Sequence, residues 1–447
     1  MATAPPPNTN PSAGPAQEED TPLPVTISET AQLLLLAASD HNLITLRSLL
    51  KSQTPNVQDP ATLRTPLHVA ILACEGLSTE PTNGTNGTNG TNGHANGDTG
   101  SAAGAASAEL ALPPIAKATK TLELLLQNGA IWNALDANNE TPGCIAYRLS
   151  LTPLYEVMVD AGVRAELLFG RLEGYVALDD DDDEEEEEIG DVEEAVDGGV
   201  VEPQEGDEEK TALDKAGEEA IPVTSEEYLA SELEIDDDRI LDEDKNGVMM
   251  SWESEIMSRT ASLLLPAATP ARVLNIGYGL GIIDSLIQSH TPPPSTHHIV
   301  EAHPQVLEKL HASPLASRPG VTIHAGRWQD VLPKLAEQGL VFDAIYFDTF
   351  AEDYSQLKLF FTEHVITLLD ADGRFGFFNG LGADRQIAYD VYRKVVEIDL
   401  LEAGLDTEWT EVPVDRGGMD GKGEWKGVRR KYWDLEKYLL PVCKFMG

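Results

Sequence analysis

Ten consecutive acidic residues, 179–188, set the strongest limit on how this chain folds. Carboxylates in a row repel one another and stay solvated, so no compact domain can run through them. Residues 172–247 carry a net charge of −29, whereas residues 1–171 and 248–447 carry only −8 each. The chain is therefore predicted to form two folded parts joined by an acidic, disordered linker, residues 172–222. A role for this linker in recruiting a basic partner is an open alternative.

Charge and composition exclude several classes of protein. The chain of 447 residues has a net charge of −45, which repels phosphate and argues against direct nucleic-acid binding. Its three cysteines form no CxxC or Cys/His cluster, so neither a disulfide framework nor a zinc site is expected. No signal peptide begins the chain, and no apolar run approaches the roughly 20 residues that span a bilayer. We expect a soluble intracellular protein with no metal and no membrane contact.

Two related Thr-Pro motifs lie in the part before the linker. Thr65-Pro66-Leu67-His68-Val69-Ala70 matches the opening of an ankyrin repeat, and Thr141-Pro142-Gly143-Cys144-Ile145-Ala146 is a degraded copy. Residues 28–171 are therefore interpreted as ankyrin-like repeats. The alternative is a helical hairpin array that has no binding role.

The same part contains further helices and two segments without core-forming residues. Residues 29–50 predict two helices broken at 40–42, and Leu154–Ala165 predicts a helix that exits at residues 160–163. The Pro-rich residues 1–27 and a Thr-Asn-Gly-rich insert at about 76–113 are predicted to be disordered.

Short apolar runs alternate with amphipathic helices after Pro270, which is typical of an α/β fold with a parallel sheet. The expected strands are Arg272–Ile276, His298–Val300, Val321–His324, Ala344–Phe347 and Arg374–Phe378. The expected helices are Gly281–Ser289, Pro304–His311, Trp328–Glu337, Tyr354–Leu369 and Asp384–Leu401. A strand at Thr407–Val414 and the segment Lys431–Cys443 are expected to close the sheet as an antiparallel hairpin.

A Gly-x-Gly-x-Gly loop, residues 277–281, joins the first expected strand to its helix. Glycines allow the backbone to approach a ligand at the carboxyl edge of the sheet. A dinucleotide site would favour a small residue where Ile282 stands, so the pattern suits S-adenosylmethionine better. A structural turn without a ligand is the alternative.

Four side chains near this edge are candidates for chemistry. Glu301 ends the second strand, where a carboxylate can accept both ribose hydroxyls. Trp328 follows the third strand and either flanks adenine or packs in the core. Asp348 ends the fourth strand and either faces the cleft or caps a helix. Glu253 lies in Met249–Glu253, which we interpret as a helix that covers the site, although a solvated helix face is equally consistent.

These motifs resemble a known family. From about Thr224 onward the chain is similar to the fungal protein arginine N5-methyltransferases (type IV), relatives of guanidinoacetate methyltransferase that carry N-terminal ankyrin-like repeats. The resemblance is carried by Val248–Glu253 (VMMSWE), Asn275–Asp284 (NIGYGLGIID), Glu301–Pro304 (EAHP), Gly326–Gln329 (GRWQ) and Tyr346–Phe350 (YFDTF). Tyr278 departs from the family, which usually has Phe there.

The resemblance implies a fold and a set of site residues. Residues 223–447 would form a class I S-adenosylmethionine-dependent methyltransferase domain, a Rossmann-like seven-stranded sheet. S-adenosylmethionine would be bound by Tyr228, Met249, Met257, Gly277, Tyr278, Gly279, Leu280, Gly281, Ile282, Ile283, Glu301, Ala302, His303, Arg327, Trp328, Gln329 and Asp348. Asp348 and Glu253 match the two acids that hold the guanidinium in the guanidinoacetate enzyme.

The chemistry is consistent with that assignment. A guanidinium with a pKa above about 12 is protonated and a poor nucleophile, and two carboxylates can clamp its planar fork and accept a proton. The resemblance implies monomethylation of the arginine δ-nitrogen in a protein, in this family a large-subunit ribosomal protein. The two-glutamate hairpin and Thr-His-Trp motif of terminal-nitrogen arginine methyltransferases are absent from the sequence. We expect a monomer in cytoplasm and nucleus.

Two other functions remain open. The chain could methylate small guanidino compounds, although these need no docking surface. It could also be a non-catalytic ankyrin scaffold, against which the Gly loop and the two acids argue.

Overall fold

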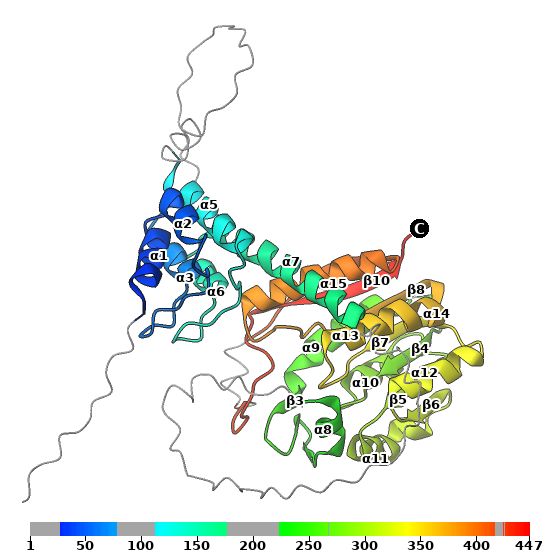
Figure 1. Cartoon of the computed structure of the whole chain (residues 1–447). Coiled ribbons are helices and arrows are strands. Elements are labelled where there is room, and N and C mark those ends of the chain that lie inside the picture. The colour runs from blue at the N-terminus through cyan, green and yellow to red at the C-terminus, as the bar shows by residue number, and fades with distance from the viewer. Residues whose placement is uncertain (1–26, 78–111, 177–222, 267, 416–422, 424) are drawn as a thin grey trace, which may run out of the picture.

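A computed structural model describes residues 27–77, 112–176, 223–266, 268–415, 423 and 425–447. Nearly all of the predicted disordered N-terminus, most of the Thr-Asn-Gly-rich insert and most of the acidic linker lie outside these residues. In the described parts, helices gather at the N-terminal end and a helix-flanked sheet follows them (Figure 1). No helix in these parts is long and apolar enough to cross a membrane.

The N-terminal part consists of helices. They are α1 (Glu29–Ser39), α2 (Leu43–Leu49), α3 (Pro66–Leu72), α5 (Pro114–Gln127), α6 (Pro142–Arg148) and α7 (Thr152–Val176). The predicted break at 40–42 is confirmed between α1 and α2. Thr65 and Thr141 precede α3 and α6 as extended N-caps, with proline at the first helical position, as expected for such starts.

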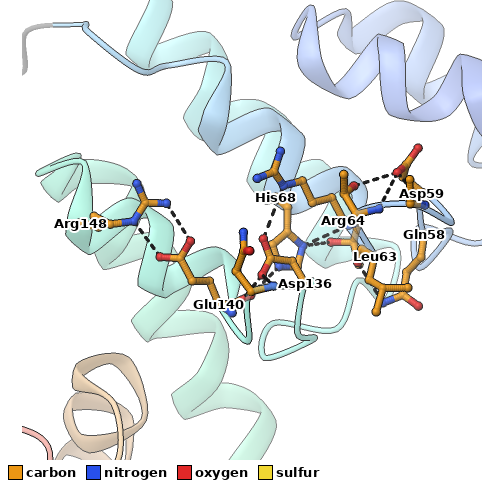
Figure 2. A network of polar contacts seen from close by, with 12 residues as sticks. Gln58, Asp59, Leu63, Arg64, His68, Asp136, Glu140 and Arg148 are labelled. Atoms are coloured by element: carbon orange, nitrogen blue, oxygen red, sulfur yellow. Dashed lines mark hydrogen bonds and ion pairs between the residues drawn. The ribbon is translucent and has the colours of Figure 1, made fainter. Parts of the chain in front are cut away.

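His68 explains the first Thr-Pro motif. Its Nδ1 accepts hydrogen bonds from the Thr65 N–H (3.1 Å) and hydroxyl (2.8 Å), and its Nε2 donates to the Glu140 carbonyl (3.0 Å). Burial lowers the pKa of His68, which favours this neutral tautomer. Figure 2 shows how the ring joins the turn before α3 to the turn before α6. The ankyrin assignment itself stays a prediction.

The predicted exit at residues 160–163 is wrong, because α7 continues through it to Val176. Gly162 is buried in the middle of this helix. A Cβ built on it would lie 2.6 Å from Cγ2 of Val391 and 3.2 Å from the Trp132 ring. The glycine therefore serves close helix packing and does not end the helix.

The predicted seven-stranded, mostly parallel sheet is confirmed. Its strands are β4 (Arg272–Ile276), β5 (Thr296–Glu301), β6 (Val321–Ala325), β7 (Phe342–Phe347), β8 (Leu369–Phe377), β9 (Leu405–Pro413) and β10 (Lys437–Phe445). They lie in the order β6-β5-β4-β7-β8-β10-β9. Strands β4 to β8 are parallel, and β10 is antiparallel to β8 and β9. The order reverses direction at β4, where open α/β sheets bind ligands.

Helices connect these strands as expected. They are α9 (Ser254–Leu264), α10 (Ile282–Ser289), α11 (Pro304–Ala312), α12 (Trp328–Glu337), α13 (Tyr354–Leu359), α14 (Ile366–Leu368) and α15 (Gln386–Glu402). The helix predicted at Tyr354–Leu369 differs in detail, because a π-helical turn, Phe360–Val365, separates α13 from α14. Leu369 already belongs to β8.

A small unit precedes the sheet. It contains α8 (Ser225–Ala230) and an antiparallel sheet of β1 (Glu234–Ile235), β2 (Arg239–Leu241) and β3 (Gly247–Met250). The helix predicted over Met249–Glu253 is therefore wrong. Met249 and Met250 pair with β2, and only Ser251–Glu253 forms a 3₁₀ turn that leads into α9.

Helix α15 joins the two parts of the molecule. It packs along α7, as Figure 1 shows, and its side chains Ile387, Val391 and Val395 belong to the N-terminal hydrophobic core. The Tyr155 hydroxyl on α7 donates to Asp390 on α15 (2.5 Å). The N-terminal helices are therefore fixed to the sheet through a shared core.

The packing of Gly162 can be tested against a glycine in the same helix. Gly162→Ala places a methyl against Val391, and overpacking of this kind costs about 1–3 kcal/mol. Gly170→Ala is the control because nothing lies within 4 Å of its Cβ, and alanine in an exposed helix gains about 1 kcal/mol over glycine. We expect denaturant unfolding to show a loss of stability for the first variant and a gain for the second. Equal gains would contradict the close contact.

Candidate active site

A cavity of about 270 Å³ lies at the carboxyl edge of the sheet. Most of the predicted site residues line it, namely Tyr228, Met249, Glu253, Met257, Gly277, Tyr278, Gly279, Ile283, Glu301, Ala302, Arg327, Trp328, Gln329 and Asp348. Four predicted residues do not, namely Leu280, Gly281, Ile282 and His303. The structure thus brings together residues from segments as distant as α8 and β7. No cluster of metal-ligating side chains is present among the described residues.

The glycine loop after β4 forms one wall of the cavity. Gly277 has φ of 89°, and a Cβ there would lie 1.9 Å from the carbonyl oxygen of Asp348. Gly279 has φ of 53°, and its Cβ would lie 2.4 Å from Sδ of Met249. Only glycine fits either position, because both the backbone angle and the space exclude a side chain. Such a cradle fits the predicted close approach of a ligand.

Buried polar side chains behind the wall hold this loop in place. The Asn275 amide donates to the Gly277 carbonyl (2.8 Å) and to both oxygens of Asp284 (3.0 Å each). His297 Nε2 lies 3.1 Å from Asp284, and both side chains are fully buried. Sequence analysis gave these residues no role, because nothing in a single sequence pairs Asp284 with His297.

Glu301 has a second task besides the predicted one. Its carboxylate accepts hydrogen bonds from the backbone N–H groups of Tyr278 (2.8 Å), Ala302 (2.8 Å) and His303 (2.7 Å). Burial raises its pKa, and these amide bonds oppose the shift. The backbone of Gly279 acts on the same carboxylate. Glu301 therefore positions the glycine loop as well as lining the cavity, and its contact with ribose stays a prediction.

Trp328 fits both of its proposed roles, because it is buried and also borders the cavity. Its ring packs edge-on against Phe347 (5.8 Å) and Phe360 (5.5 Å). Its indole N–H donates to Glu352 (2.9 Å), which also accepts from the Thr349 hydroxyl (2.6 Å). Glu352 was not predicted from the sequence, because it belongs to none of the recognised motifs.

Helix α8 and strand β3 cover the cavity. The Tyr228 ring lies 5.0 Å from the rings of both His303 and Phe350. His303 Nε2 donates to the Ser231 carbonyl (3.3 Å), so this residue supports the cover and does not face the cavity. Arg327 pairs with Glu226 of α8 (3.1 Å).

Glu253 and Asp348 face the cavity from different elements. Glu253 is only 3% exposed, so the solvated-helix interpretation is wrong. Asp348 does not cap a helix, because Asp353 is the N-cap of α13. Burial raises the pKa of Glu253 to about 7. Burial and then the charge of Glu253 raise the pKa of Asp348 well above its usual range. Two such acids in one cavity favour a bound cation.

Tyr432, a residue that sequence analysis missed, holds Glu253 in place. Its hydroxyl donates to Glu253 Oε1, which also accepts from the Met250 N–H (3.3 Å). The Tyr432 ring stacks on Trp252 at 6.1 Å and meets Trp425 edge-on at 5.2 Å. The residue comes from the segment between β9 and β10, and no motif distinguishes it.

Tyr432→Phe tests this support. The hydrogen bond from Tyr432 holds the pKa of Glu253 below the value that burial alone would set. Its loss raises that pKa further, so the acid limb of the expected methyl transfer, measured as kcat/KM, moves to higher pH. The rate at pH 7 should fall about tenfold, since a hydrogen bond to a charged group contributes roughly 1.5–3 kcal/mol.

Tyr392→Phe is the matched control, because its hydroxyl bonds Glu166 in the seam between α15 and α7. If the acid limb of the pH profile of kcat/KM does not move in Tyr432→Phe, Tyr432 does not support Glu253 in this way.

Comparisons with known proteins identify relatives of this chain. Residues 223–406 match the guanidinoacetate N-methyltransferase family. The chain is 51% identical over 433 residues to a protein from Aspergillus fumigatus called protein arginine N-methyltransferase 2, with 93% of this chain and 96% of that protein covered. Proteins of the same name from Emericella nidulans and Neurospora crassa are 48% and 43% identical. These alignments cover 94% and 93% of this chain, and 98% and 96% of the two relatives.

Proposed function

The chain belongs to the protein arginine N-methyltransferase 2 family, and we propose that it transfers a methyl group from S-adenosylmethionine to an arginine of a protein. The single observation that carries the proposal is the pair of acids, Glu253 and Asp348, which open onto the cavity beside the glycine loop. The glycine loop, which the motif resemblance assigns to the donor, lines the same cavity and packs against Asp348 and Met249, where a Cβ on Gly277 or Gly279 would clash. Glu301 lines the same cavity, at the end of the strand next to the glycine loop.

The acids perform the substrate chemistry. When bound, S-adenosylmethionine supplies an electrophilic methyl group on its sulfonium. Glu253 and Asp348 clamp the planar guanidinium and draw its positive charge away from the reacting nitrogen. An ionised carboxylate of the pair accepts the proton that this nitrogen must lose. Burial raises the pKa of Glu253 to about 7, which makes this carboxylate an effective acceptor near neutral pH.

The finer details remain part of the proposal. We propose monomethylation of the arginine δ-nitrogen, a large-subunit ribosomal protein as acceptor, and a monomeric enzyme of cytoplasm and nucleus. They rest on the motif resemblance. The ankyrin-like interpretation of the N-terminal helices, which the bridging His68 supports, would supply a docking surface for a protein.

The site of methylation can be tested directly by mass spectrometry. The chain is incubated with labelled S-adenosylmethionine and ribosomal proteins from a fungal extract, with free arginine and guanidinoacetate in parallel reactions. We expect one added methyl on one arginine, and fragment ions that place it on the internal nitrogen. Label on terminal nitrogens alone would refute the δ-nitrogen assignment, and label only on the small compounds would favour the small-molecule alternative.

Asp348→Asn tests the proton acceptor. The amide keeps the shape of the side chain but loses the basic oxygen, so transfer should fall about a hundredfold or more. Calorimetry should show that S-adenosylmethionine still binds with near wild-type affinity. Asp372→Asn is the control, since Asp372 is exposed in β8, away from the carboxyl edge of the sheet. Wild-type turnover in Asp348→Asn would remove Asp348 from the mechanism, and wild-type protein that binds no donor would favour the scaffold alternative.

A further inference from the structure

A second cavity, of about 660 Å³, lies next to the first and is the larger of the two. We call it the outer cavity. Its walls come from residues 223–226, 246–247, 350–353, 382–384 and 430–432, together with Arg327, Gln329, Gln356 and Gly380. None of the predicted catalytic or donor-binding roles requires a cavity of this size here.

The two cavities meet beside the acids. Nine residues line both of them, whereas Glu253 and Asp348 line only the inner one. The nine shared residues are Ser225, Arg327, Gln329, Phe350, Ala351, Glu352, Asp353, Gly380 and Tyr432. The Tyr432 hydroxyl donates to Glu253. A side chain that passes from the outer cavity along Tyr432 therefore reaches Glu253.

The part of the inner cavity formed by the glycine loop lies away from the outer cavity. Gly277, Gly279 and Glu301 line the inner cavity alone. Of the residues predicted to bind the donor, only Arg327 and Gln329 also line the outer cavity, so most of the outer cavity is left for the second substrate. We propose that the outer cavity holds the extended main chain on either side of the target arginine, and that the arginine side chain enters past Tyr432. This inference rests on the proposed function.

The charges on the outer walls favour a segment with a single arginine over a run of basic residues. Glu226 pairs with Arg327 (3.1 Å), and Asp384 pairs with Arg385 (2.8 Å). Glu352 accepts from Trp328 and Thr349. Because these acids already have partners, they add little attraction for flanking positive charge. Which protein segments are accepted then depends on whether a segment is narrow and extended enough to enter the outer cavity.

The outer cavity also adjoins the N-terminal helices. Its wall at residues 382–384 leads directly into α15, which begins at Gln386. Ile387 packs against α6, where a Cβ on Gly143 would lie 2.6 Å from Ile387 Cγ1. A protein that places a segment in the outer cavity therefore lies next to the helical part, which a small guanidino compound would not need.

Two bulky substitutions on separate wall segments test the proposal. Asp384 and Arg430 are exposed and line only the outer cavity, so Asp384→Trp and Arg430→Trp narrow it without touching the donor site. The acceptor is the methylated protein that mass spectrometry identifies. We expect KM for this protein to rise about tenfold or more, with kcat at saturation and the Kd of S-adenosylmethionine each within about twofold of wild type. Asp372→Trp, an equal substitution away from the carboxyl edge, should leave all three unchanged.

The possible failures can be told apart. An unchanged KM in both tryptophan variants, with transfer intact, would overturn the outer-cavity assignment alone. A weaker Kd for S-adenosylmethionine in either variant would overturn it too, because the outer cavity would then hold part of the donor. Absence of protein methylation by the wild-type chain would refute the proposed function itself. Thermal unfolding checks that each variant folds. If Asp384→Trp does not fold, Arg430→Trp alone tests the proposal.

Discussion

The burial of two carboxylates in one cavity is the constraint on which the rest of the site depends. Burial raises the pKa of both Glu253 and Asp348, and the charge of Glu253 raises the pKa of Asp348 further. Hydrogen bonds from Tyr432 and from the Met250 backbone offset part of this cost at Glu253. A cation that enters the cavity would offset the rest of this cost of burying the two carboxylates. The site is thus least favourable when empty, as expected of a pocket built for a guanidinium.

Main-chain contacts fix the position of Asp348 beside the glycine loop. The Asp348 N–H bonds the Ile276 carbonyl (2.9 Å), and the Asp348 carbonyl lies against Gly277. The loop that fits the donor and the acid that fits the arginine are therefore neighbours across β4 and β7. Because backbone atoms make this contact, the main chain of Asp348 keeps its place beside the loop whatever the side-chain rotamers are. Such rigidity suits a reaction that depends on alignment.

The N-terminal helices are part of the same rigid structure. A long acidic segment separates them from the sheet in sequence, yet α7 and α15 pack as one core. Glycines at 143 and 162 permit that close approach. The helical part therefore holds a constant position relative to the outer cavity.

The sequence by itself determined the elements and the outline of the site. Hydrophobic periodicity placed β4 and α12 at their observed bounds, and the glycine pattern located the loop, because these signals depend on neighbours along the chain. The position of Asp348 at a strand end and of Glu253 just before the sheet made both acids candidates, and the motif resemblance supplied their roles. Only the tertiary structure revealed the roles of Tyr432 and Glu352. It also showed that Met249 and Met250 belong to strand β3 and not to the predicted helix, and that α7 continues through Gly162. Each of these depends on a partner far away in sequence, and local pattern contains no information about which distant residues will meet.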